Sequence, residues 1–384
     1  MRGFITFLPL FLRFSFRFHN FAEKIIKEEL QEFRHMPQTI IHSHLLNQEL
    51  TIALSECSHD KLFVLVDLTT LRFCWPVISG FTCLRDSHLI IIGAGDSHKN
   101  LDTLSQVWGS LVEGGATRHS CLINLGGGMV TDLGGMAAST FKRGINFINL
   151  PTTLLAMVDA SVGGKTGINF HGLKNEVGVF SEATHVILDT IFLKTLDTEN
   201  LRSGYAEMLK HALLYNNKMW QRHLAYDLSA PDLIQLGDMV SESVAVKQHI
   251  VTEDPHERGI RKALNLGHTV GHALESWALN RGKPILHGYA VAYGLICELY
   301  LSCLHTGFPT EKMRSTVQYI RDFYGHLPIT CKDYPKLLDL MHHDKKNVAN
   351  SINFTLLGDI GDIRINQMVS ENDIQEALDF FREG

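Results

Sequence analysis

Hydrophobic and polar positions divide the chain into two patterns. In the first half, short apolar runs at 63–67, 88–93, 119–125 and 147–150 alternate with helical spacing such as that at 101–112. Runs of this length are typical of strands that are buried on both faces, and their alternation with helices indicates a parallel sheet. The first half therefore predicts a Rossmann-like α/β domain.

Beyond about residue 193, long helix-like segments replace this alternation. Glycine turns and short polar connections separate them, and they cover 203–214, 233–251, 267–279, 288–304 and 311–324. Apolar residues three and four positions apart predict helices with one buried face. We therefore expect an α/β domain over residues 36–190, followed by a helical domain over 191–384.

The amino terminus differs from the rest of the chain. Residues 1–21 contain seven phenylalanines and three arginines but no acid. The apolar run at 4–12 is too short to span a bilayer, and no small-residue cleavage site follows it, although an interfacial helix is an alternative. We expect residues 1–35 to be an extension outside the fold, and the protein to be cytoplasmic.

Composition excludes several classes of protein. The 384 residues include 35 basic and 41 acidic ones, giving a net charge of −6, so no basic excess indicates nucleic acid binding. Seven cysteines without a CxxC pair argue against a disulfide framework and a thiolate zinc cluster. The 21 histidines raise the question of a metal site, because histidine is both a metal ligand and a proton carrier.

Two glycine-rich segments stand out. Gly126–Gly128 follows the predicted strand at 119–125, and Asp132 comes soon after. Glycines in this place let the backbone approach a phosphate at a helix amino terminus, although the spacing is not GxGxxG and a tight turn is an equal alternative. Gly163–Thr166 is like the end of a P-loop, but the earlier glycine of that motif is absent, so ATP is not implied.

The segment at 151–167 is dense in polar groups beside glycines. It contains Asp159 and Lys165, and Lys174 and Asn175 follow it. A structural loop rarely needs such a combination, so we interpret the segment as functional. Lysines here suit a phosphorylated or carboxylated substrate.

A second polar group lies in the helical half. Arg261, Asn265, His268 and His272 are spaced by four, three and four residues, which predicts one stripe on one helix. His287 follows in a His-Gly turn. The sequence HTVGH lacks the glutamate of HExxH, so a zinc protease is disfavoured.

Glu207 and Lys210 are three residues apart in a predicted helix that is apolar enough to be buried. Glu207 with His268 and His287 would form a two-histidine, one-carboxylate zinc site with an open position. From the spacing alone, a pair of buried core histidines remains the alternative.

The order and spacing of these motifs resemble the 3-dehydroquinate synthase family of sugar phosphate cyclases. The resemblance covers about residues 60–360, and its main blocks are Gly126–Gly128 with Asp132, 151–167, Lys174 with Asn175, 204–210, 265–272 and 286–288. It implies an amino-terminal NAD domain, a helical domain that holds zinc or cobalt, and a homodimer. The implied reaction converts 3-deoxy-D-arabino-heptulosonate 7-phosphate to 3-dehydroquinate and phosphate, in the shikimate pathway to aromatic amino acids.

The resemblance also implies a role for individual residues. The metal ligands would be Glu207, His268 and His287. The NAD site would be lined by Gly127, Gly128, Asp132, Thr152, Thr153, Asp159, Lys174, Thr195 and Leu196, with Asp67, Asp96 and Lys99 at the adenosine end. The substrate would be surrounded by Asp159, Lys165, Asn175, Lys210, Lys247, Arg261, Asn265 and His272. Arg143 would reach in from a partner protomer, and a lysine of the pair Lys345 and Lys346, taken as Lys345, would close the site.

In the implied reaction, NAD+ oxidises the C5 hydroxyl, phosphate is eliminated, the hydride returns to C5, and an intramolecular aldol step closes the ring. NAD is therefore recycled, and His272 is the candidate for proton transfer. Two positions depart from the family pattern: Tyr289 stands where many members have glutamate, and Asn200 stands where a glutamate often contacts the ribose.

Three alternatives remain. Another sugar phosphate cyclase, forming a valiolone or an inosose, would not need Lys247 and Arg261 together, because its substrate lacks a carboxylate. A metal-dependent polyol dehydrogenase would release NADH and would not need the crowded lysines. A catalytically inactive NAD-binding regulator would be expected to lose a metal ligand, whereas all three are present. The length leaves no room for a multifunctional pathway protein.

Overall fold

A six-stranded parallel sheet forms the first half of the fold. The structure is a computed structural model that describes residues 38–171, 173–342 and 352–383. The strand order is β1-β8-β5-β4-β2-β3, and all neighbours are parallel. The strands are β1 (Thr39–His42), β2 (Leu62–Asp67), β3 (His88–Ile92), β4 (Cys121–Gly126), β5 (Asn146–Pro151) and β8 (His185–Leu188). The predicted Rossmann-like sheet is confirmed.

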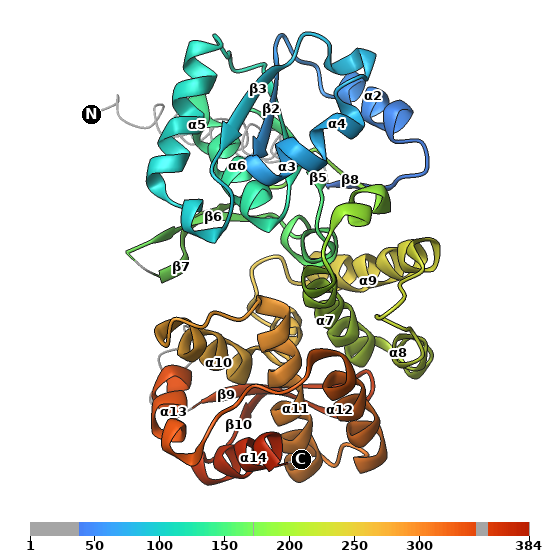
Figure 1. The fold of residues 1–384 in the computed structure, drawn as a ribbon, viewed down its shortest axis with the longest axis vertical. Helices are drawn as coiled ribbons and strands as arrows, with labels where there is room; N and C mark the ends of the chain where they lie inside the picture. The colour runs from blue at the N-terminus through green and yellow to red at the C-terminus, as the bar shows by residue number, and fades with distance from the viewer. Residues whose placement is uncertain (1–37, 172, 343–351, 384) are drawn as a thin grey trace, which may run out of the picture. The chain divides into compact units, whose positions relative to one another are not determined.

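Helices cover both faces of this sheet (Figure 1). One face carries α5 (Leu101–Glu113) and α6 (Gly128–Thr140), and the other carries α2 (Leu46–Glu56), α3 (Leu68–Phe73) and α4 (Trp75–Ile78). Because both faces are covered, the central strands β2 and β4 are buried along their whole length. This burial explains why their sequences are mostly apolar, with Asp67 and Asn124 as the polar exceptions.

Helices dominate from Thr198 onward, as predicted. They are α7 (Thr198–Tyr215), α8 (Asn217–Leu224), α9 (Leu233–Glu253), α10 (His268–Asn280), α11 (His287–Thr306), α12 (Thr310–Tyr324), α13 (Tyr334–His342) and α14 (Glu371–Glu383). Helix α11 packs against α7, α10, α12 and α14, so it is buried on nearly all sides. Among the described residues, no helix is both long and apolar enough to cross a membrane.

Two antiparallel ribbons were not predicted. One joins β6 (Lys165–Phe170) to β7 (Leu173–Phe180), and every residue of β7 is exposed. The other joins β9 (Asn353–Asp359) to β10 (Asp362–Met368) within the helical half, and β9 packs on α11. The extension predicted for residues 1–35 lies outside the described residues, as do Lys345 and Lys346.

The prediction of one continuous helical stripe from Arg261 to His272 was wrong. Arg261 and Asn265 belong to a short 3-10 segment at Ile260–Asn265, whereas His268 is the first residue of α10. The chain breaks between them because Gly267 takes a left-handed conformation with φ of 79°. The four side chains therefore come from two elements rather than one face.

Backbone contact between α10 and α11 brings the two histidine-bearing helices close together. A Cβ atom added to Gly294 on α11 would lie 1.9 Å from the carbonyl oxygen of Gly267, and one on Gly271 would lie 2.8 Å from that of Ala290. These approaches leave no room for any side chain at either glycine.

We expect Gly294→Ala to lower the free energy of unfolding by about 1–3 kcal/mol, because the new methyl group must push the two helices apart. Gly109→Ala is the matched control, since its Cβ would have no neighbour within 4 Å on the exposed face of α5. That control should instead gain about 0.5–1 kcal/mol from helix propensity. Denaturant unfolding of both variants checks the pair, and equal stability of the two would contradict the packing.

Candidate functional site

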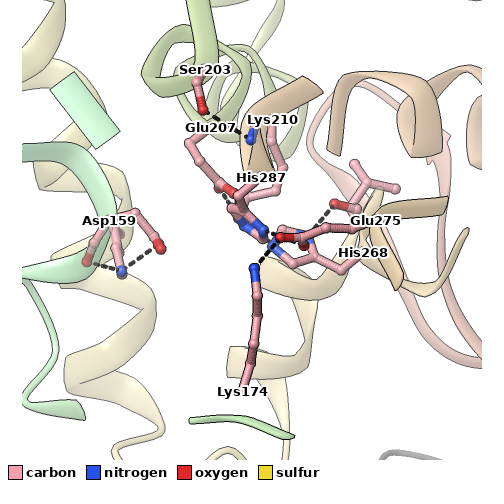
Figure 2. A network of polar contacts seen from close by, with 11 residues as sticks. Asp159, Lys174, Ser203, Glu207, Lys210, His268, Glu275 and His287 are labelled. Carbon is pink, nitrogen blue, oxygen red and sulfur yellow. Dashed lines mark hydrogen bonds and ion pairs between the residues drawn. The ribbon is translucent and has the colours of Figure 1, made fainter. Parts of the chain in front are cut away.

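The carboxylate of Glu207 is the centre of a buried polar cluster. Glu207 lies on α7 and has no exposed surface. His268 and His287, the first residues of α10 and α11, each place Nε2 at 3.4 Å from Glu207 Oε1. Lys210, one turn further along α7, forms an ion pair with the other carboxylate oxygen. Figure 2 shows both imidazole rings lying beside this carboxylate.

The spacing of these groups fits a divalent metal. Two ligands that are each about 2.1 Å from a tetrahedral zinc ion lie about 3.4 Å from one another. Glu207 Oε1 is also buried without a hydrogen-bond partner among the described residues. Such an atom normally has a partner, and a cation held by the carboxylate and both rings would supply it. The residues present therefore suit a metal with two histidine ligands and one carboxylate ligand.

The other nitrogen of each ring is already engaged. His268 Nδ1 lies 3.1 Å from the carbonyl oxygen of Leu266, and His287 Nδ1 lies 3.2 Å from Glu275 Oε2. Glu275 in turn accepts a 2.6 Å hydrogen bond from Lys174 of β7, which Figure 2 shows reaching the cluster. Partners of this kind orient metal-binding histidines, since they leave Nε2 free to face the ion.

The charges of the cluster depend strongly on burial. Burial acts to raise the pKa of Glu207, but Lys210 and His268 outweigh it and hold that pKa well below its usual range. Burial and the charge of Lys210 lower the pKa of His268 to about 3. Burial opposes protonation of His287, but the nearby carboxylates of Glu207 and Glu275 outweigh it and raise the pKa of His287 to about 10. A metal at this place would compete with the proton on His287.

His272 lies beside the same centre. Its ring centroid is 5.2 Å from that of His268 and 5.8 Å from that of His287. One ring nitrogen from each of the three histidines falls within 4.8 Å of the other two. A metal bound by His268 and His287 could therefore take its third ligand from either Glu207 or His272.

Asp159 and Lys247 form a second charged pair next to the cluster. Lys247 of α9 donates to the backbone oxygen and the carboxylate of Asp159, each at 2.5 Å. Burial lowers the pKa of Lys247, whereas Asp159 acts in the opposite direction. Asp159 also approaches Glu207 and His211, with ligand atoms of the three within 4.8 Å of one another. Lys210 pairs with the carboxylate of Glu207 and Lys247 with that of Asp159, so the two acids and the two lysines form one charged network.

Three more of the predicted substrate residues, Lys165, Arg261 and Asn265, lie around a loop that contains Glu257. This carboxylate bonds Lys165 at 2.6 Å and Asn265 at 3.1 Å. Arg261 is buried and donates to the backbone oxygens of Pro255 and Gly163, at 2.6 and 3.1 Å. The structure thus brings residues of the sheet half and the helical half together at this loop.

The glycine-rich turn lies where a nucleotide crevice is expected. The chain runs from β2 to the edge strand β3 and then returns to β4 on the other side of β2, and ligands of open α/β sheets bind at the carboxyl ends of strands at such a reversal. Gly127 and Gly128 follow the carboxyl end of β4 and begin α6. A Cβ atom on Gly127 would lie 3.0 Å from the Thr153 side chain. A side chain at this position would therefore be crowded, whereas glycine lets a ligand approach the backbone amides of the turn.

Several predicted nucleotide residues lie near this turn or at the carboxyl ends of the neighbouring strands. Lys99 is buried and contacts Asp132 at 2.5 Å, and it also bonds Asn175. Burial raises the pKa of Asp132, although Lys99 acts in the opposite direction. Asp67 ends β2 and accepts hydrogen bonds from two amides of α3, so it also caps that helix. Asp96 contacts Asn169 of β6 and Lys174 of β7. The amide of Thr152 donates to the carbonyl oxygen of Gly126 at the end of β4, whereas Thr195 and Leu196 donate to the backbone of Phe192 and Leu193 in their own segment.

Arg143 lies apart from the cluster. It is exposed, takes a left-handed conformation with φ of 69°, and comes just before the amino end of β5. A non-glycine residue held in this region is strained, and such strain is concentrated at functional sites. Thr152 follows the carboxyl end of the same strand, so the two residues lie at opposite edges of the sheet.

Sequence reasoning missed Glu275 and Glu257. Glu275 follows His268 by seven residues on α10, which places both on one face of the helix, and this spacing was the signal that could have found it. Glu257 has no such signal, because its contacts come from the tertiary approach of β6 and the loop before α10.

Comparisons with known proteins agree with this geometry. The family models described as 3-dehydroquinate synthase N-terminal and C-terminal match residues 89–203 and 204–347. A 3-dehydroquinate synthase from Parabacteroides distasonis is 50% identical over 346 residues, covering 90% of this chain and 98% of the relative. One from Pyrococcus furiosus is 39% identical over 328 residues, covering 85% and 94%.

Solved structures show the same fold. A 2-deoxy-scyllo-inosose synthase complexed with carbaglucose-6-phosphate, NAD+ and Co2+ has a TM-score of 0.77 at 22% identity, covering 90% of this chain and 96% of that one. A 2-epi-5-epi-valiolone synthase from Streptomyces hygroscopicus, with NAD+ and Zn2+ bound, has a TM-score of 0.77 at 23% identity, covering 91% and 98%.

Fold and site define a class of enzyme in which a nucleotide-type parallel sheet is joined to a helical half with a buried histidine and glutamate cluster. Within that class, the two family models and the relative at 50% identity decide the family. The chain belongs to the 3-dehydroquinate synthase family.

Metal content should distinguish the roles of the neighbouring histidines. If His268 is a metal ligand, His268→Ala should lose bound zinc and activity. The loss of zinc should exceed the roughly 10–100-fold weakening that changes to the partners of ligands typically cause. His272→Ala, the matched control one turn further along α10, should keep one zinc per protomer and lose activity. Metal analysis after dialysis of both variants is the measurement. If His272→Ala lost zinc and His268→Ala kept it, the ligand set would be wrong.

Proposed function

We propose that the chain converts 3-deoxy-D-arabino-heptulosonate 7-phosphate to 3-dehydroquinate and phosphate in the shikimate pathway. The observation that carries the proposal is the junction of the Glu207, His268 and His287 cluster with two buried lysines, Lys210 and Lys247. Two buried lysines beside a cluster that could hold a metal suit a small substrate that carries both a phosphate and a carboxylate. The 50% identity to a 3-dehydroquinate synthase supports the same substrate.

The cofactors we propose are NAD and Zn2+ or Co2+. Two neighbours of the same fold carry NAD+ with one or other of these metals. Glu207, His268 and His287 would hold the metal, while the turn at Gly127 and Gly128 would receive the pyrophosphate. When bound, NAD would accept and return a hydride, and the metal would polarise a substrate oxygen.

The side chains of the protein would bind, orient and move protons. Lys247 and Arg261 would bind the substrate carboxylate, and Lys210 would lie beside the reacting hydroxyl. His272, held next to His268 but not needed as a ligand, would transfer protons within the site. Holding one conformer of the substrate makes the elimination and the ring closure effectively unimolecular. Asn175, Lys165 and Asn265 would complete the substrate site.

The proposed division of labour follows the two halves of the chain. Residues 36–190 would bind NAD, and residues 191–384 would hold the metal and much of the substrate. Lys174 and Asp159 would connect the halves, since they contact Glu275 and Lys247. We also propose a cytoplasmic protein, because all seven cysteines are free thiols, which is typical of a reducing compartment.

We propose a homodimer in which Arg143 completes the site of the neighbouring protomer. Arg143 precedes β5, whose six residues extend about 20 Å toward the crevice, so it is too far from its own site. The exposed ribbon strand β7 supports an interface, because Leu173 and Phe180 are 58% and 56% exposed there. An exposed strand with apolar side chains is a template for pairing with a second copy.

A coupled assay should separate this activity from its alternatives. With NAD+ and Zn2+ or Co2+ present, the heptulosonate phosphate should release phosphate without sustained growth of NADH absorbance. A heptulose 7-phosphate without the carboxylate should have a kcat/KM at least about a hundredfold lower, since Lys247 and Arg261 would lose their partner. Steady NADH accumulation without phosphate release would indicate a dehydrogenase, and preference for the second substrate would indicate another cyclase.

Mixed dimers should reveal the role of Arg143. Arg143→Ala and His268→Ala should each be inactive alone, because every site lacks one group. In a dimer of the two variants, the protomer with intact ligands receives Arg143 from its partner. Random mixing of equal amounts should therefore restore about a quarter of wild-type activity. Activity that stays at the level of the separate variants would contradict a shared site.

A further inference from the structure

Glu298 is a fully buried acid that neither the motifs nor the proposed mechanism uses. It lies on α11 with no exposed surface. Its two carboxylate oxygens accept different backbone amides at the start of α10. Oε2 accepts from Gly267 N at 2.6 Å, and Oε1 accepts from Val270 N at 3.1 Å.

The start of α10 needs such a partner. The first amides of a helix have no acceptor within the helix, and a side chain at the N-cap position usually supplies one. Here the N-cap is Gly267, which has no side chain and a φ of 79°. The cap therefore comes from a neighbouring helix. A negative charge at this end is also favoured by the helix dipole.

The same contact links two proposed metal ligands. The amides of Gly267 and Val270 flank His268, so Glu298 holds the backbone on both sides of that residue. Glu298 itself lies on α11, whose first residue is His287. The carboxylate therefore fixes the backbone that carries one histidine to the helix that carries the other.

We propose that Glu298 is a positioning residue for the metal centre, acting through the backbone of His268. The inference rests on the proposed set of metal ligands. A carboxylate is the suitable group because it can accept both amides, one with each oxygen. Glutamine has the same shape but would turn an NH2 group toward one of the two N–H donors, which repels it.

The test compares zinc affinity with stability in the full chain. Zinc is removed with a chelator, and the dissociation constant is then measured by competition with a chromogenic chelator. We expect Glu298→Gln to raise the zinc Kd about tenfold or more, as changes around metal-binding histidines do. Thermal unfolding of the metal-free protein is measured in parallel.

Asp232→Asn is the matched control. Asp232 caps α9 by accepting the amides of Ile234 and Gln235, and about 20 Å of helix separates it from Lys247. Asparagine keeps an oxygen that accepts these amides but removes the negative charge that favours the amino end of the helix, so this variant should lower the melting temperature slightly and leave the zinc Kd within about twofold. If Glu298→Gln does not fold, Glu298→Asp replaces it, because the shorter acid can reach only one amide and should also raise the Kd.

The outcomes are distinct. An unchanged zinc Kd in the Glu298 variants would overturn the positioning role, and so would an equal rise of Kd in Asp232→Asn. A wild-type chain that binds no zinc, or a His268→Ala variant that binds zinc normally, would refute the proposed metal site itself and the inference with it. A raised Kd confined to the Glu298 variants supports the inference.

Discussion

The buried charge of Glu207 is the constraint around which the helical half is organised. An ionised carboxylate without solvent is tolerated only when cationic groups or a metal surround it. Its partners come from three helices, so α7, α10 and α11 must meet at one point. Glycines next to the cluster permit this: a Cβ atom on Gly204 would lie 2.4 Å from Leu155 N, and one on Gly288 would lie 1.8 Å from Ser203 O. The close packing of these helices is therefore what allows the polar groups to meet at Glu207.

The same constraint extends into the sheet half. Asp159 brings a second acid near Glu207, and two such charges repel each other unless cations separate them. Lys210 and Lys247 provide those cations, each paired with one of the acids. Because these lysines are buried and already close to the cluster, the anionic substrate proposed above would find them in place, and little reorganisation would be needed.

The sequence predicted the elements whose signal is local. Strands β2 to β5 and helices α7 and α9 to α12 were expected near their observed bounds, because each strand is a short, mostly apolar run and each helix a long segment with helical spacing. The break at Gly267 was missed, since a continuous spacing of polar residues hides a change of backbone conformation. The roles of Glu257 and Glu298 were missed for another reason: their partners lie on other elements, and no spacing along the chain encodes such contacts.

The two departures from the family pattern have local explanations. His287 and Tyr289 are two residues apart on α11, so their side chains leave the helix about 200° apart. Tyr289 packs on Tyr324 of α12 with ring centroids 5.1 Å apart, so it joins an aromatic group on a different side of the helix. Asn200 bonds Asp197 in the cap of α7. Neither residue is one of the proposed metal ligands. The two departures therefore concern helix packing and capping, and the cluster of Glu207, His268 and His287 is still formed.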